Sequence, residues 1–121
     1  MTNLQMGTAE SRFADIIWSH EPLSSSDLAR LSGAELGWKK TTSYTVLKRL
    51  CEKGIFQNCK GTVTSLISRE EYYSMQSEQF VEEKFGGSLP AFLAAFTARK
   101  RLDSREVEEL RRMVEEYKEE S

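Results

Sequence analysis

The chain has 121 residues, of which 39% are hydrophobic and 30% charged, and its formal net charge is −2. This length suits one ordinary domain, or a small domain with an extension that buries its apolar face against a partner. No apolar run nears the roughly 20 residues of a membrane span, no secretory signal begins the chain, and two cysteines form no metal motif, which predicts a cytoplasmic protein without cofactor or metal.

Two amphipathic helices are expected first. Residues 8–20 carry an apolar stripe, and Pro22 ends this helix. Ser24, three residues before Asp27, predicts the N-terminus of a second helix that carries Leu28 and Leu31 to about Gly33. The stripe of the first helix consists of Ala9, Phe13, Ile16, Ile17 and His20. The single histidine therefore reads as a packed residue rather than a catalyst.

Residues 37–54 predict a third helix with two unlike faces. One face is expected to point to the core and holds Ser43, Tyr44, Leu47, Leu50 and Cys51. The other holds short hydroxyls and then cations: Thr41, Thr42, Thr45, Lys48 and Arg49, with Glu52. Hydroxyl side chains can meet phosphates or base edges, and Lys and Arg meet phosphates or guanine, so this face suits a DNA groove.

Positive charge is concentrated around this helix. Residues 39–60 contain six basic side chains against Glu52 alone, whereas residues 69–121 contain nine basic and thirteen acidic ones. A polyanion would therefore be steered to this one patch and away from the C-terminal half.

Residues 55–67 predict a β-hairpin turning at Lys60 and Gly61. Three helices followed by a hairpin give the order of a winged helix-turn-helix domain, in which the third helix enters the major groove. Lys60 and Thr62 are candidate DNA contacts on the wing. A polar turn residue without a ligand is the equal alternative for Lys60.

The fold class is thus mainly α with a small β-hairpin: a winged helix-turn-helix domain in residues 1–68 and a three-helix dimerisation region in residues 69–121. The three acidic helices of the second region would expose apolar stripes in a lone chain, and a second copy would cover them. In the alternative, they fold back on the first domain of a monomer. The candidate dimer residues are Tyr72, Phe80, Phe85, Leu89, Phe92, Leu93, Phe96, Val107, Leu110, Val114 and Tyr117.

Several separated motifs carry a family resemblance. The stretch WKKTTSYTVLKRLCEKG, a short wing, SREEY, FGGSLPAFLAAF and RLDSREVEELRRMVEE occur in this order. This pattern resembles the penicillinase-repressor family and its copper-responsive relatives. The resemblance implies a homodimeric transcriptional repressor on a palindromic DNA operator, with contacts from Lys40, Thr41, Thr42, Tyr44, Thr45 and Arg49.

Two departures from the family pattern concern the inducing signal. Copper-responsive members bind metal through C-terminal cysteines, whereas the last helix here contains none, so copper sensing is not expected. Antibiotic-responsive members are cleaved at an Asn-Phe bond, which implies a regulatory protease as a further candidate partner. The matching position here is Ala95-Phe96.

The sequence thus predicts a sequence-specific DNA-binding repressor that is not an enzyme, since no Gly-rich phosphate loop and no nucleophile with a base are present. The alternative is a winged helix protein-interaction module without specific DNA binding. The candidate DNA-binding residues are Lys39, Lys40, Thr41, Thr42, Tyr44, Thr45, Lys48, Arg49, Lys60 and Thr62.

Overall fold

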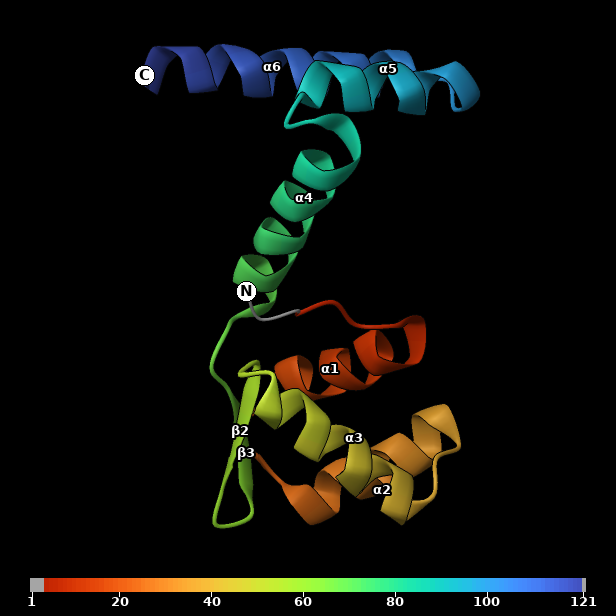
Figure 1. Cartoon of the computed structure of the whole chain (residues 1–121), viewed down its shortest axis with the longest axis vertical. Helices are drawn as coiled ribbons and strands as arrows, with labels where there is room; N and C mark the ends of the chain where they lie inside the picture. Colours follow the sequence, from red (N-terminus) through yellow and green to blue (C-terminus); the bar gives the residue numbers. More distant parts are fainter. Residues whose placement is uncertain (1–3, 121) are drawn as a thin grey trace. The chain divides into compact units, whose positions relative to one another are not determined.

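The computed structural model describes residues 4–120 and divides into two compact units (Figure 1). The first unit extends to Ser77 and the second begins at Glu78, so the division falls within one continuous helix, α4 (Arg69–Phe85). The first unit holds three helices and a small sheet, and the described residues of the second form helices joined by short connections, with no strand.

The ends of the first two helices are set by the residues that flank them. Helix α1 (Thr8–His20) ends before Pro22, as expected. Helix α2 (Ser25–Leu36) begins at Ser24, whose Oγ accepts a hydrogen bond from the Asp27 amide at 3.0 Å. It continues past the expected end because a helix tolerates glycine in its interior, and it stops where Gly37 adopts the left-handed conformation with φ 70°.

Two strands after α3 (Lys40–Glu52) and one short strand before α2 form a three-stranded antiparallel sheet. Strands β2 (Phe56–Cys59) and β3 (Thr62–Ser65) form the expected hairpin (Figure 1). Lys60 and Gly61 both have positive φ, 53° and 86°, which is the geometry that joins two strands by a two-residue turn. The short strand β1 (Leu23–Ser24) pairs with the other edge of β3 and was not expected from the sequence.

The core of the first unit lies between the three helices and the sheet. Its fully buried large side chains are Phe13, Ile17, Leu28, Leu50, Ile55, Phe56 and Val63. Tyr72, in the first turn of α4, completes this core: it is 3% exposed, and its hydroxyl donates to the carbonyl of Leu4 at 3.0 Å. The N-terminal part of α4 is thus built into the first unit.

The second unit contains the rest of α4, then α5 (Leu89–Arg99) and α6 (Ser104–Glu120). Ser88 caps α5 by accepting from the Ala91 amide at 3.1 Å. Asp103 and Glu106 cap α6 reciprocally, because each side chain accepts from the backbone amide of the other. Beyond Tyr72, none of the described side chains is buried. No helix in the described part of the chain is long and apolar enough to cross a bilayer.

Candidate nucleic-acid interface

Helix α3 has one buried and one exposed face. The buried positions are Ser43, Val46, Leu47 and Leu50, so Val46 takes the place in the core that the sequence pattern gave to Tyr44. Tyr44 is 37% exposed at the edge of the helix, and Cys51 is half-buried at the same edge. Both flank the core rather than form it, and Tyr44 remains accessible to a ligand.

The expected hydroxyl face is present on α3. Thr41, Thr42 and Thr45 are all exposed. The Thr45 hydroxyl donates to the Thr41 carbonyl within the helix at 2.9 Å, which leaves it only acceptor capacity toward a ligand. Thr42 makes no side-chain hydrogen bond to any described residue and can both donate and accept. The two threonines therefore offer different chemistry to a base edge.

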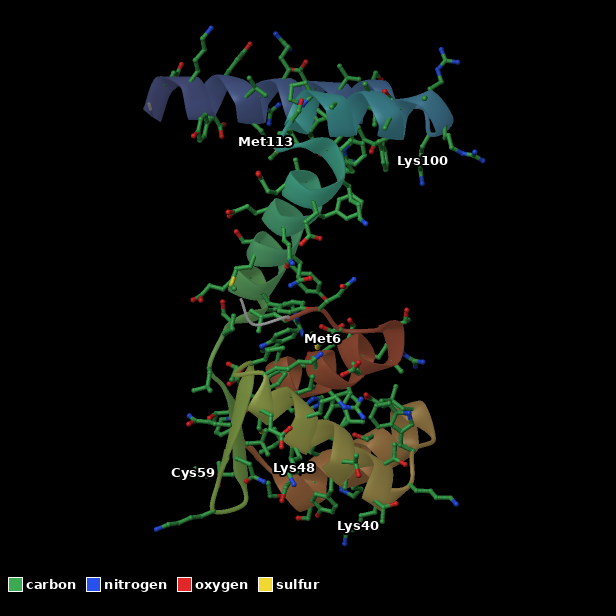
Figure 2. All side chains as sticks on the ribbon, in the orientation of Figure 1. Met6, Lys40, Lys48, Cys59, Lys100 and Met113 are labelled. Atoms are coloured by element: carbon green, nitrogen blue, oxygen red, sulfur yellow. The ribbon has the colours of Figure 1, made fainter. Side chains whose placement is uncertain are left out.

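The cations of α3 divide into free and engaged groups. Lys39, Lys40 and Lys48 are exposed and make no ion pair within residues 4–120; Figure 2 shows Lys40 and Lys48 on this helix. Arg49 instead lies 3.7 Å from a Glu10 carboxylate oxygen of α1, and the Lys53 ammonium donates to the Gln5 carbonyl at 2.7 Å. Uncompensated charge is thus concentrated in the first two-thirds of α3.

The start of α3 also favours an anion. Its N-cap residue, Lys39, makes no side-chain cap bond, so no side chain in the described structure satisfies the first amides of the helix. Free amides and the positive end of the helix dipole attract a negatively charged group such as phosphate.

The wing presents the two predicted side chains at its tip. Lys60 is exposed at the turn, and Thr62 is exposed at the start of β3. Asn58 fixes the turn because its Oδ1 accepts from the Gly61 amide at 3.0 Å. Strand β2 packs beside α3, which joins the wing to this helix within one unit.

Helix α2 adds two residues that sequence reasoning missed. Ser26 and Arg30 line a shallow depression together with Ala29 and Lys40. Arg30 pairs only with the exposed Asp27, at 3.6 Å, and an exposed pair of this kind stabilises weakly. The i,i+4 spacing of Ser26 and Arg30 was the available signal, since it places both side chains on one face of α2.

The predicted dimer residues divide into three groups. Tyr72 belongs to the core of the first unit and keeps almost no surface for a partner, because α4 begins there. Phe85, Phe92, Leu93 and Leu110 are half-buried within the second unit. There the Phe92 ring makes edge contacts with the rings of Phe80 and Phe85, which contact each other at a tilt. The remaining exposed positions are Phe80, Leu89, Phe96, Val107, Val114 and Tyr117.

Three helices, a β-hairpin wing and an exposed hydroxyl-and-cation face on the third helix define a winged helix-turn-helix protein. Comparison with known proteins identifies the family: residues 6–116 match the penicillinase repressor model, and the chain belongs to that family. A curated relative, the penicillinase repressor of Bacillus licheniformis, is 27% identical over 118 residues, which cover 94% of this chain and 92% of that protein. The family is one of transcriptional repressors.

Proposed function

We propose that the protein is a homodimeric, sequence-specific DNA-binding repressor that acts on a palindromic operator in the cytoplasm. The observation that carries this proposal is the exposed face of α3: exposed hydroxyls and lysines without an ion pair in the described structure lie on a helix whose opposite face packs into the core. Membership in the penicillinase repressor family supports the same role.

In the proposed complex, α3 enters the major groove. Thr41, Thr42, Tyr44 and Thr45 read base edges, while Lys39, Lys40, Lys48 and Arg49 neutralise phosphates. Lys60 and Thr62 contact the backbone beside the wing, and Arg30 of α2 joins Lys40 at a phosphate. Few Arg, Asn or Gln side chains lie where bidentate base contacts form, so sequence choice rests on hydroxyl contacts and DNA shape.

The second unit supplies the reason for a dimer. Its apolar side chains remain open to solvent in the single chain, including Val107 at 50% and Val114 at 65% exposure on α6. Pairing of two copies would cover this surface and place two α3 helices one DNA turn apart, about 34 Å, or a multiple of it. Occupation of a promoter in this way would exclude RNA polymerase.

A regulatory protease is a further proposed partner. Ala95 and Phe96, at the position that matches the cleaved bond of antibiotic-responsive members, are exposed in the middle of α5. A helical backbone does not fit a protease cleft, so cleavage there would require α5 to open locally.

The test is DNA binding by the full chain at two ionic strengths. Purified protein is used to select bound fragments from genomic DNA, and affinity for the selected and for random duplexes is then measured at 50 and 200 mM salt, as order-of-magnitude settings. We expect a selected palindrome, a steep loss of affinity with salt and a preference over random DNA. Salt-independent or undetectable DNA binding would instead favour the protein-interaction module.

A further inference from the structure

Glu10 lies in the first turn of α1, at the third helical position. Its Oε1 accepts a weak hydrogen bond from the Gly7 amide at 3.4 Å. Its Oε2 is enclosed by protein and makes no hydrogen bond to any of the described residues. The one cation within 4 Å of this carboxylate in the described chain is Arg49, whose Nη1 lies 3.7 Å from Oε2.

The pair is unequally exposed. The Glu10 side chain is 21% exposed and the Arg49 side chain 52%. The Glu10 carboxylate is largely desolvated and therefore depends on Arg49 to compensate its charge. Arg49 still presents part of its guanidinium to solvent. No other cation of α3 has a carboxylate partner within the described residues.

We propose that Glu10 is a sequence-independent brake on DNA binding, because its carboxylate competes with a DNA phosphate for Arg49. This inference rests on the proposed function of α3. If Arg49 moves to a phosphate, the enclosed Glu10 oxygen is left without a partner, and that cost opposes binding. The cost arises on any DNA, because phosphates carry no sequence information.

The competition between Glu10 and phosphate predicts how Glu10→Gln changes DNA affinity. Glutamine has the same shape and can still accept from Gly7, but it does not hold Arg49. Affinity should rise by a similar factor, about two- to fivefold, for operator and random DNA, since exposed and half-exposed ion pairs contribute up to about 1 kcal/mol. The slope of log affinity against log salt should steepen by less than about 0.9, the contribution of one phosphate, because Glu10 holds Arg49 off the phosphate in only part of the wild-type complexes.

The experiment compares four full-length variants on a random duplex over a range of salt, by fluorescence anisotropy: Glu10→Gln, Glu35→Gln, Arg49→Gln and the double variant Glu10→Gln/Arg49→Gln. Glu35 is an exposed acid on α2 with no ion pair in the described structure, so its variant removes the same charge without freeing an arginine. We expect tighter binding and a steeper slope for Glu10→Gln, less change for Glu35→Gln, and no gain when Arg49 is also replaced.

Glu10→Asp separates direct pairing from the general field of the protein, because it keeps the charge but shortens the side chain. The proposal expects this variant also to bind DNA more tightly than the wild type. A gain no larger than that of Glu35→Gln, or one that persists in the double variant, would overturn the inference. Wild-type binding without salt dependence would instead overturn the proposed function, so the two failures are distinguishable.

Discussion

The guanidinium of Arg69 contacts the carboxylate of Asp15, with 3.2 Å between Nε and Oδ1, and so joins the first residue of α4 to α1. The same guanidinium donates to the Asp15 carbonyl at 3.2 Å and the Ser19 hydroxyl at 3.0 Å. It also lies 5.8 Å from the centre of the Trp18 ring, whose indole N–H donates to the Ile67 carbonyl at 3.0 Å. The start of α4 is therefore held on α1 by several different interactions.

Replacement of Arg69 should loosen this attachment. We expect Arg69→Ala to lower the free energy of unfolding by about 1 to 2 kcal/mol, since partly exposed ion pairs stabilise weakly and each further hydrogen bond adds about 1 kcal/mol. Urea unfolding followed by tryptophan fluorescence measures the change. Arg69→Lys keeps the charge but loses the fork of donors, and it should recover less than half of the lost stability. Full recovery by lysine would show that charge alone matters.

Ser43 should respond in the opposite direction. Its hydroxyl is enclosed on the core face of α3 and has no hydrogen-bond partner in the described structure. An enclosed unsatisfied polar group costs about 1 to 3 kcal/mol, so Ser43→Ala should stabilise the protein by about 1 kcal/mol. Ser32 is the matched control, because its buried hydroxyl donates to the Leu28 carbonyl at 2.7 Å. Ser32→Ala should therefore lower the stability. Thermal unfolding in which Ser32→Ala raises the stability and Ser43→Ala lowers it would contradict this expectation.

Local signals account for most of the fold. The spacing of Phe13, Ile16 and Ile17 and the break at Pro22 predicted α1 with its observed bounds, and Lys60-Gly61 predicted the turn of the wing. These features depend on neighbouring residues alone. The end of α2 at Gly37 was harder to predict. Gly33 lies four residues earlier in the sequence and is an equally good candidate for a helix end.

Features that depend on distant residues escaped prediction. Two residues of β1 carry no strand pattern, and they pair only because β3 offers an edge beside them. Val46 and Tyr44 lie at the two borders of the apolar stripe of α3, and only packing against α1, α2 and the sheet decides which is buried. The pairing of Glu10 with Arg49 joins positions far apart in the chain, so neither residue alone signals it.

Thr42 and Arg49 should show different kinds of loss in DNA binding. Both substitutions to alanine should weaken operator binding, but only Thr42→Ala should change the preference among operator variants. The reason is that the Thr42 hydroxyl and methyl can meet base edges, whereas Arg49 is proposed to contact a phosphate. Competition binding with a panel of single-base operator variants measures the difference. Equal losses on operator and random DNA for Thr42→Ala would refute its assigned role.

The two cysteines should differ in their reaction with iodoacetamide. Burial raises the pKa of the Cys51 thiol, and the negative charge of Glu52 raises it further. At pH 8 a smaller fraction of Cys51 is therefore present as the reactive thiolate than for a thiol with the ordinary pKa. Its labelling should accelerate as the pH rises toward the raised pKa. Cys59 is exposed on β2, where Figure 2 labels it, and should react first. Mass spectrometry of timed digests gives both rates, and faster labelling of Cys51 at pH 8 would contradict the prediction.

Val114→Glu should separate the two copies of the proposed dimer without unfolding either. Val114 is 65% exposed on α6, so a charged side chain at this position meets solvent in the single chain but an apolar surface in a dimer. Sedimentation should therefore show a monomer, with unchanged helix content by circular dichroism. Operator affinity should fall by about a hundredfold or more, because linked binding of two α3 helices is lost. Arg112→Gln on the same helix changes the charge by the same amount at a polar position, and it should leave both dimer and affinity intact. A Val114→Glu protein that remains a tight dimer would exclude the exposed face of α6 as the interface.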